Sequence, residues 1–516
     1  MLAKCYSGAI NGVDASTVEI EVYSVKSTSS FTIVGLPDAA VREAKDRVTT
    51  ALKNSGWKSR DEFAVTVNLA PADVRKEGPI YDLPMAICLL KATQRLGTEA
   101  LDRYGMVGEL ALSGEVRKVR GVLPIAMEMK RIGRKAILVP VENAREASIV
   151  SGIDVIPVAT LEDAARYLAG EIEIEPCRTD IGAMLASSPG RLDDLADVRG
   201  QETAKRAMEV AVAGGHNILM VGSPGSGKTM LARCIPSILP PLGVEEALEV
   251  SKIHSVAGAA KGTCGFVATR PFRAPHHTVS SIGLLGGGAH PVPGEVSLAH
   301  RGVLFLDEFA EFPRQALEVM RQPLEDGHVC VSRASASCDY PSRFLLVAAM
   351  NPCPCGYYGD RRRECRCTQS QILKYQQRVS GPLLDRIDMQ IGVSGVLASD
   401  LERAPTGESS ATVRERVVRA RAIQAERYRR LPGVLVNADV KGRDLREACR
   451  LTDDAAKELH RRMDIFALSA RAHDRILKVA RTIADLAGKE RVDEASVMEA
   501  ASYRQLDDCG GRSFWA

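Results

Sequence analysis

A glycine-rich segment directly follows the apolar run Ile218–Val221. It consists of Gly222-Ser223-Pro224-Gly225-Ser226-Gly227-Lys228-Thr229. A loop of this composition can turn its backbone N–H groups toward phosphates, and the helix after it adds the positive end of its dipole. In this pattern the lysine reaches the β- and γ-phosphates, and the threonine hydroxyl binds Mg²⁺. The segment predicts a phosphate-binding loop for a nucleoside triphosphate such as ATP, with Mg²⁺ as its companion.

Two acidic residues end a second apolar run. The run Gly302–Leu306 is followed by Asp307 and Glu308. Alone, this pattern is typical of an ordinary strand exit. Together with a phosphate-binding loop, it predicts that Asp307 binds magnesium and that Glu308 polarises the attacking water. A third run ends at Asn351, whose amide either orients water beside the γ-phosphate or, standing before proline, starts a turn.

Four of the 13 cysteines form a cluster, Cys353-Pro-Cys355 and Cys365-Arg-Cys367. Four thiolates in two close pairs can surround a tetrahedral Zn²⁺. One residue between the members of a pair is fewer than the usual two, so reduced thiols and a redox pair remain alternative interpretations. We expect zinc, because a structural zinc site with an apparent binding energy of about 10–16 kcal/mol can order a hydrophilic loop without a core.

Arginines near this cluster and in a hairpin-like segment are candidate contacts for DNA. Arg361, Arg362 and Arg363 lie between the cysteine pairs, and Arg333 lies in Val329–Ser335. Arginine binds phosphates independently of base sequence and in a salt-sensitive way. Solvated surface charge explains each of these residues equally well. The adjacent His276 and His277 cannot readily share one tetrahedral ion, so a packing or DNA-contact role is favoured for them.

The composition limits the class of protein. A chain of 516 residues with 45% hydrophobic content can bury several cores, and its length favours three or four domains. The net charge is only +3, so any contact with nucleic acid depends on local clusters. Scattered cysteines in an odd number argue against a disulfide framework. We see neither a signal peptide nor an apolar run of membrane-spanning length, and we expect a cytoplasmic protein without a membrane partner.

The elements that must position these residues fall into three regions. Residues 1–170 mix strand and helix patterns and predict an α+β domain, and residues 171–190 are rich in turn formers and predict a linker. Residues 191–400 alternate between strands and helices, which predicts an α/β core with a parallel sheet. The cysteine cluster at 353–367 is an insertion in that core. Residues 401–516 show helical periodicity and predict an all-helical module.

The order of these motifs resembles that of AAA+ ATPases, and most closely that of the magnesium-chelatase-like group. The resemblance rests on the P-loop, Leu306-Asp307-Glu308, Ala349-Met350-Asn351-Pro352 and Pro382–Asp388, and it extends to Ile33–Ala40 and Pro275–Thr278. It implies a homo-hexamer with ATP bound between subunits. It also implies that Arg386 is an arginine finger for the neighbouring site and that Arg471 is the sensor of a helical lid. A surface salt bridge with Asp385 and Asp388 is the alternative for Arg386.

The first 170 residues resemble the proteolytic domain of Lon in fold. The resemblance rests on Lys76–Pro79 and Val107–Val116. Lon uses a serine and a lysine, whose amine deprotonates the hydroxyl. The matching positions here are Ile80 and Leu123, and neither can perform that chemistry. We therefore expect no peptidase activity and a docking or DNA-guiding role for this domain.

The favoured function is an ATP-driven hexameric DNA motor, and the resemblance implies branch migration during recombination in natural transformation. The hairpin that carries Arg333 is similar to the pore hairpin of minichromosome-maintenance helicases. One alternative is the ATPase subunit of a metal-chelatase complex, which leaves that hairpin and the cysteine cluster unexplained. Another is a regulatory or chaperone-like module that uses ATP as a switch, for which an intact Glu308 and Arg386 would be unnecessary.

Overall fold

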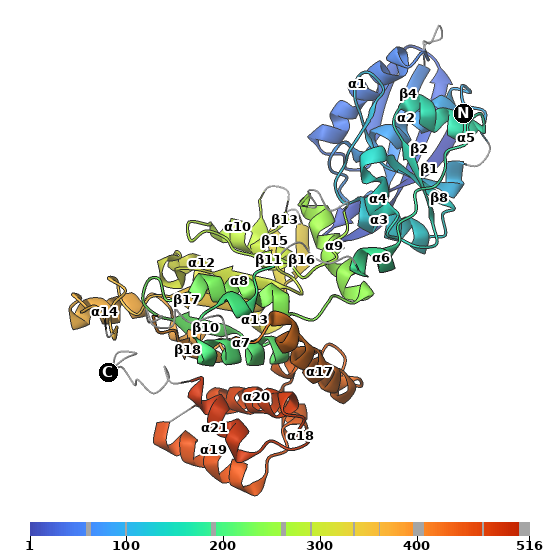
Figure 1. Ribbon diagram of the computed structural model, residues 1–516. Coiled ribbons are helices and arrows are strands. Elements are labelled where there is room, and N and C mark those ends of the chain that lie inside the picture. Colours follow the sequence, from blue (N-terminus) through green and yellow to red (C-terminus); the bar gives the residue numbers. More distant parts are fainter. Residues whose placement is uncertain are drawn as a thin grey trace.

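The chain folds into three parts that follow one another along the molecule (Figure 1). The computed structural model describes residues 1–57, 63–98, 101–186, 192–259, 265–288, 291–333, 336–360, 362–395, 407–466 and 469–504. Figure 1 shows the N-terminal part in blue and teal, a central part in green and yellow, and helices in orange and red beyond it. No helix within these ranges has both the length and the apolar character needed to cross a bilayer.

The N-terminal part is built on a mixed seven-stranded sheet with the order β3-β4-β2-β1-β5-β8-β9. Its two longest strands, β1 and β2, form an antiparallel pair from Leu2↔Tyr23 to Asn11↔Asp14. Helix α1 begins after Asp38, whose carboxylate accepts the Val41 N–H at 2.7 Å and caps the helix. Ile80 and Leu123 are 8% and 0% exposed, so both lie in the apolar core. The elements are β1 (Leu2–Asn11), β2 (Asp14–Lys26), β3 (Ser30–Val34), α1 (Ala39–Asn54), β4 (Phe63–Ala70), α2 (Asp82–Ala92), β5 (Tyr104–Met106), β6 (Glu109–Leu110), β7 (Val116–Arg117), α3 (Val122–Arg131), β8 (Ala136–Pro140), α4 (Ala144–Ala147), β9 (Asp154–Val158) and α5 (Leu161–Ala169).

Within the segment predicted to be a linker, residues 171–190, the structure describes residues 171–186, which pack on the N-terminal part. It contains a short helix, α6 (Ile181–Ala186). Upstream of this helix, Cys177 N–H donates to the Val155 carbonyl at 2.8 Å. Ile181, Met184 and Leu185 pack against the N-terminal core. Apolar residues spaced along the segment therefore hold it on the first part of the molecule, a packing that its turn formers did not reveal.

The central part is an α/β unit with a parallel sheet in the order β11-β14-β17-β10-β18. Alternate residues of β10 pack into two different hydrophobic cores, one on each face of the sheet. Ile218 and Met220 pack with α7, α8 and the C-terminal helices, whereas Leu219 and Val221 pack with α11, α12 and α15. Burial on both faces explains why these strands are continuously apolar. The elements are α7 (Glu202–Gly214), β10 (Ile218–Val221), α8 (Lys228–Ile238), α9 (Val244–Ala257), β11 (Phe272–Arg273), α10 (Ser281–Leu285), β12 (Gly286–Gly287), β13 (Val292–Pro293), α11 (Glu295–Leu298), β14 (Val303–Leu306), α12 (Arg314–Glu318), α13 (Arg321–Asp326), β15 (His328–Arg333), β16 (Ala336–Pro341), β17 (Leu345–Met350), α14 (Gln369–Gln376), α15 (Gly381–Leu384) and β18 (Met389–Gly392).

Helix α9 fastens the central part to the N-terminal part. Its residue Ser255 accepts the Gly121 N–H at 3.3 Å through its carbonyl oxygen, and Lys252 pairs with Asp14 at 2.7 Å. Leu242, Ala247 and Phe266, on or beside α9, belong to the N-terminal hydrophobic core. The two parts therefore share one core at this junction.

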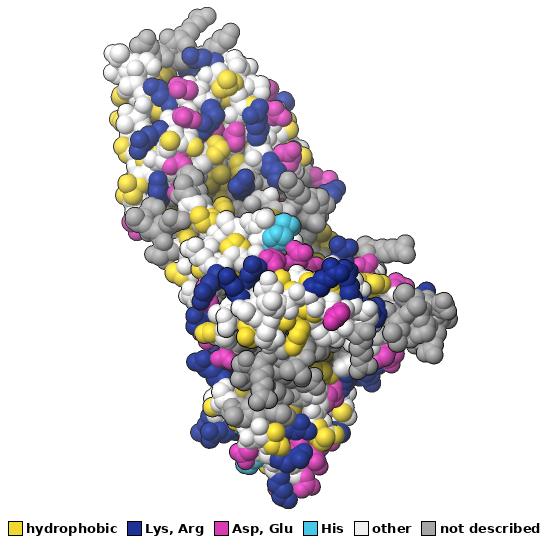
Figure 2. Space-filling view, turned by 90° about the vertical axis from the view of Figure 1, so that its left-hand side faces the viewer, with side chains coloured by type: hydrophobic (Ala, Val, Ile, Leu, Met, Phe, Trp, Pro, Cys, Tyr) yellow, Lys and Arg dark blue, Asp and Glu magenta, His cyan; other side chains and the backbone are white. Residues whose placement is uncertain are grey.

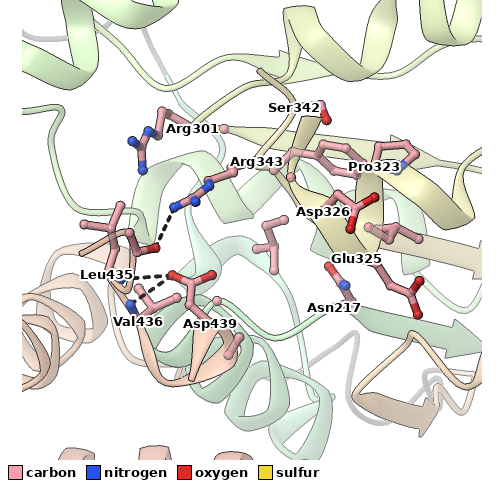
Figure 3. A pocket seen from close by; sticks show the side chains of 18 of the residues that line it. Asn217, Arg301, Pro323, Glu325, Asp326, Ser342, Arg343, Leu435, Val436 and Asp439 are labelled. Atoms are coloured by element: carbon pink, nitrogen blue, oxygen red, sulfur yellow. Dashed lines mark hydrogen bonds between the residues drawn. The ribbon is translucent and has the colours of Figure 1, made fainter. Parts of the chain in front are cut away.

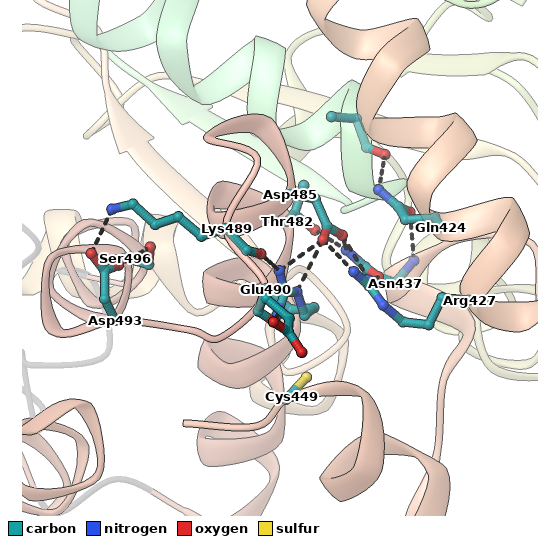
Figure 4. Close-up of polar contacts among 12 residues, drawn as sticks. Gln424, Arg427, Asn437, Cys449, Thr482, Asp485, Lys489, Glu490, Asp493 and Ser496 are labelled. Atoms are coloured by element: carbon teal, nitrogen blue, oxygen red, sulfur yellow. Dashed lines mark hydrogen bonds and ion pairs between the residues drawn. The ribbon is translucent and has the colours of Figure 1, made fainter. Parts of the chain in front are cut away.

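The C-terminal elements in the described ranges are helical: α17 (Ser410–Tyr428), η6 (Asn437–Asp439), α18 (Gly442–Ala448), α19 (Asp453–Phe466), α20 (Ala470–Leu486) and α21 (Glu494–Ser502). A buried polar network around Asp485 joins them (Figure 4). The Asp485 carboxylate accepts bonds from Arg427 at 2.8 Å, Asn437 at 2.9 Å and Arg481 at 3.1 Å. Thr482, one turn away, bonds to His216 just before β10 at 2.7 Å. The helices are thus tied to the strand that leads into the glycine-rich loop.

Candidate nucleotide-binding site

The glycine-rich loop joins the carboxyl end of β10 to the amino end of α8. Gly225 and Gly227 have φ angles of +75° and +91°, a backbone region that glycine enters without the steric cost of a side chain. The Ser226 N–H donates to the Ser223 carbonyl at 3.2 Å and tightens the turn. The first N–H groups of an α-helix such as α8 have no partner within the helix and point toward its amino end. The loop has the shape and polarity that an anionic phosphate requires.

Lys228, the first residue of α8, is folded into this loop. Its ammonium group donates to the carbonyl oxygens of Gly222 at 2.7 Å and Ser223 at 3.0 Å, and Asn351 Oδ1 lies 3.4 Å away. Burial lowers the pKa of Lys228 to about 8. The cation and the Asn351 amide therefore meet at the mouth of the loop, although their residues are far apart in sequence.

Two hard oxygen ligands lie side by side next to Lys228. Thr229 Oγ1 donates to Asp307 Oδ2 at 2.7 Å, which joins the start of α8 to the end of β14. Sheet order explains this meeting, because β17 lies between β10 and β14 and all three strands end at the same edge. A hydroxyl and a carboxylate are the protein ligands that Mg²⁺ accepts beside nucleotide phosphates, and the pair fits that ion.

Glu308 has a left-handed backbone with a φ angle of +52°. Its N–H donates to Asp307 Oδ1 at 2.9 Å, and its side chain, 56% exposed, pairs with His277 Nδ1 at 2.9 Å. From the sequence, we singled out the two histidines and favoured a packing or DNA-contact role for His277. The structure instead places it beside the predicted catalytic glutamate. The signal in the sequence was the motif Pro275–Thr278, but nothing in it indicated this partner.

Arg386 and Arg471 lie at the opposite edge of the sheet from this chain's own P-loop. The Arg386 carbonyl accepts from Asn217, the residue before β10, at 3.2 Å. The Arg386 side chain is 10% exposed and pairs with Glu325 of α13, not with the flanking aspartates. Glu325 lines a pocket of about 290 Å³ at this edge (Figure 3). Arg471, 70% exposed, lies 3.9 Å from Asp385. Both arginines therefore face away from the nucleotide site of the same chain.

The four clustered cysteines converge. Cys353, Cys355 and Cys365 have sulfur–sulfur distances of 3.4, 3.6 and 3.7 Å, and with Cys367 all four sulfurs lie within 4.8 Å of one another. A tetrahedral zinc site with Zn–S bonds of about 2.3 Å has sulfurs about 3.8 Å apart. The N–H groups of Tyr358 and Cys367 donate to Cys353 and Cys365 sulfurs at 3.3 and 3.4 Å, as the outer shell of a metal site does. The donor set fits Zn²⁺.

The arginines predicted to contact DNA lie in different settings. Arg333 ends β15 and is in register with Ala336 of β16. Arg361 lies outside the described residues. Arg362 pairs with Asp360 at 3.4 Å, and Arg363 covers the Tyr357 ring at 4.2 Å from its centroid. Arg362 and Arg363 therefore already have protein partners within the cysteine cluster.

Comparison with known proteins finds similar sequences over almost the whole length of the chain. Three family models match: subunit ChlI of Mg-chelatase over residues 18–143, magnesium chelatase subunit ChlI over 194–401, and its C-terminal model over 407–504. The "Uncharacterized protein YifB" of Salmonella typhimurium is 43% identical over 511 residues, which cover 98% of this chain and 97% of that protein. The "Competence protein ComM" of Haemophilus influenzae is 43% identical over 509 residues, 98% of each chain. A Lon protease of Leptospira interrogans is 25% identical over 170 residues, 32% of this chain and 20% of that protein.

A parallel sheet with a P-loop after one strand and an Asp-Glu pair after another defines the class of P-loop α/β proteins. Within that class, the relatives that match over the full length of the chain identify its family. The chain belongs to the magnesium-chelatase-like ComM family.

Proposed function

We propose that the protein is an ATP-driven motor that acts on DNA as a homo-hexamer. The observation that carries the proposal is the meeting of Thr229 and Asp307 at 2.7 Å beside Lys228 in the P-loop. This arrangement brings a phosphate cradle, a cation and two oxygen ligands for Mg²⁺ to one edge of the sheet. Family membership supports ATP as the nucleotide and Mg²⁺ as its companion.

Each residue of the site has a distinct task in this proposal. The N–H groups of the P-loop and Lys228 bind the triphosphate, and Thr229 and Asp307 hold the magnesium ion, which supplies charge neutralisation at the phosphates. Glu308 orients and polarises the attacking water, with His277 fixing its carboxylate. Asn351, in contact with Lys228, detects the γ-phosphate end of the nucleotide.

The position of two arginines supports assembly of the chain with further copies of itself, and the family resemblance implies that six copies form the ring. Arg386 and Arg471 lie at the sheet edge remote from the P-loop of the same chain, so they can complete only a site on another subunit. Arg386 would stabilise the charge of the transition state, an effect worth about 10³–10⁵ in rate. In the single chain the guanidinium is paired with Glu325 and only 10% exposed, so in this proposal Arg386 exchanges Glu325 for the nucleotide of the neighbouring subunit. In this proposal the helices from α17 onward serve as the lid, and Arg471 is its sensor.

DNA as the partner is supported by a relative and by the distribution of charge. The Haemophilus influenzae relative carries the name competence protein, which supports a role in DNA recombination during natural transformation, with branch migration as the specific activity. Figure 2 shows Lys and Arg side chains gathered at two places across the middle of one face, with acidic side chains and histidine between them. We assign Arg333, Arg361, Arg362 and Arg363 to phosphate contacts and Cys353, Cys355, Cys365 and Cys367 to zinc.

The N-terminal part serves in docking or in guiding DNA. It spans residues 1–170 in our proposed division, followed by the connecting segment 171–190, the AAA+ core 191–400 and the helical module 401–516. Its similarity to Lon does not bring peptidase chemistry, since Ile80 and Leu123 have neither a nucleophile nor a base.

A metal-chelatase ATPase subunit is the second candidate, because the matching family models are those of the chelatase. Measuring ATP hydrolysis with and without branched or single-stranded DNA, at two salt concentrations, separates the candidates. We expect stimulation by DNA that weakens at high salt, together with ATP-dependent displacement on a three-way or four-way junction. The Lys228→Ala variant should show neither. ATP hydrolysis that is indifferent to every DNA tested would overturn the motor and favour the chelatase role or an ATP-operated switch.

A further inference from the structure

The loop that carries the clustered cysteines lies directly on the P-loop. We call residues 352–367 the cysteine loop, of which all but residue 361 are described. A hydrogen bond from Ser223 of the P-loop holds the pKa of Asp360 down, to about 2, and the Asp360 side chain is only 5% exposed. A Cβ added at Gly356 would lie 2.6 Å from Pro224 Cδ. Backbone and side chain of the cysteine loop thus both touch the phosphate-binding segment.

A pocket of about 660 Å³ opens between these two loops. Its lining includes Gly222 and Ser223 of the P-loop and Tyr358, Asp360 and Arg362 of the cysteine loop. Gln201 and the backbone of 392–395 complete the pocket. Its size is that of a small-molecule site. Because it continues from the P-loop, it is placed to take the nucleoside end of a nucleotide whose phosphates occupy the P-loop.

A sulfur atom of the cysteine cluster holds one of the residues that line this pocket. The Tyr358 N–H donates to Cys353 Sγ at 3.3 Å. Asp360 in turn accepts the Arg362 N–H at 2.7 Å, and the Arg362 side chain packs against Gly395, which also lines the pocket. Apart from Pro352 and Cys353, most of the described side chains in this loop are partly or fully exposed, so the loop has little apolar core of its own. Its shape depends on what holds the four sulfurs together.

We infer that the cysteine loop forms one wall of the nucleoside subsite, so that zinc bound at the four sulfurs and nucleotide bound at the P-loop stabilise each other. The inference rests on the proposed function, because it takes the P-loop to bind a nucleotide. Linkage makes the effect reciprocal: if zinc raises the affinity for nucleotide by some factor, nucleotide raises the affinity for zinc by the same factor.

Two binding measurements test this coupling without any readout of hydrolysis. The first is the rate at which a chromogenic chelator removes zinc from the full-length protein, with and without saturating ADP. The second is the dissociation constant of ADP for the zinc-loaded and the zinc-stripped protein. We expect ADP to slow zinc release by about tenfold and zinc removal to weaken ADP binding by about tenfold, within the usual range of coupling between sites.

Two variants distinguish the contribution of the pocket-lining residue Asp360 to ADP binding from the contribution of the bound zinc. Asp360→Ala keeps all four cysteines, so it should retain one zinc per chain but bind ADP about tenfold more weakly and lose the protection by ADP. Glu364→Gln changes an exposed residue of the same loop and should behave as the wild type. ADP affinity that is unchanged by zinc removal and by Asp360→Ala, or a protein that takes up no zinc, would overturn the inference and leave the proposed ATP-driven motor intact, although the second result would also remove the zinc assignment. A zinc-loaded protein that binds no ADP would overturn the proposed function itself.

Discussion

Glu308 occupies an unusual backbone conformation where β14 ends. A φ angle of +52° in a residue with a side chain costs on the order of 1–3 kcal/mol. The surrounding contacts repay that cost: the Glu308 N–H donates to Asp307 and its carboxylate meets His277. The conformation separates the directions of the two neighbouring carboxylates, so that Asp307 meets Thr229 while Glu308 meets the loop that carries the histidines.

This geometry leads to a prediction for the Glu308→Gln variant. An amide of the same shape keeps the position of the side chain but cannot polarise water, so ATP should still bind while the hydrolysis rate falls by about 10²–10⁴. Equilibrium binding of a fluorescent ATP analogue and steady-state ATPase rates measure the two effects. Replacing His277 by Gln is the matched comparison and should lower the rate much less. Near-normal turnover of Glu308→Gln would show that another group activates the water.

From the sequence alone, the segments of the candidate site could be singled out but not the side chains that they contact, and the roles given to the site residues stay predictions. The P-loop and the acidic pair could be located because their chemistry depends on residues that are adjacent in the chain. The contacts of His277 with Glu308 and of Glu325 with Arg386 depend on how separate loops meet, which local patterns do not encode. The cysteine loop is the clearest case, since nothing between Cys353 and Cys367 indicated that Asp360 would bond to Ser223.

At the scale of elements, periodicity was a reliable guide wherever helices or strands bury one face. Helix α20 (Ala470–Leu486) lies in the region for which helical periodicity was predicted, and strand β14 covers the apolar residues before Asp307. The least predictable elements were short ones held by tertiary contacts, such as α6 in the expected linker. Pairs such as Asp485 and Arg427, which join α20 to α17, were also invisible in the sequence.

The Asp485 network should make a large contribution to the stability of the C-terminal helices. The Asp485 side chain is 0% exposed and that of Arg481 is 1% exposed, so Asp485→Ala would leave a buried guanidinium without its carboxylate. Breaking a buried pair in this way typically costs about 3–5 kcal/mol. Urea unfolding followed by circular dichroism should show an earlier first transition.

The matched control is Asp454→Ala, which removes a surface pair with Lys457 whose side chains are 74% and 78% exposed. Exposed pairs of this kind contribute about 0–1 kcal/mol, and we expect no measurable shift. Equal unfolding curves for the Asp485 and Asp454 variants would mean that the network does not hold the helices together.

At the scale of the whole molecule, a catalytic site divided between two subunits can be tested by mixing. Lys228→Ala removes the P-loop cation, and Arg386→Ala removes the finger while leaving the P-loop intact. Each variant alone should be inactive. In a mixed ring, some interfaces combine the intact P-loop of an Arg386→Ala subunit with the intact arginine of a Lys228→Ala subunit, so part of the ATPase activity should return.

Sedimentation or light scattering with ATP and DNA establishes that the mixed rings form. Two variants of the P-loop, Lys228→Ala and Thr229→Ala, serve as the control mixture, because no combination of those subunits restores an intact P-loop. Recovery in neither mixture, with ring formation demonstrated, would mean that Arg386 does not complete the site of a neighbouring subunit.

The junction at α9 also determines how this protein can be divided for study. Leu242, Ala247 and Phe266 lie in the core of the N-terminal part, although they belong to the central part by sequence. A shortened chain that started at residue 192 would expose those side chains to water as a hydrophobic patch. Such a fragment would tend to aggregate through a surface that is buried in the intact chain. Polar substitutions at these positions would be needed to keep the fragment in solution.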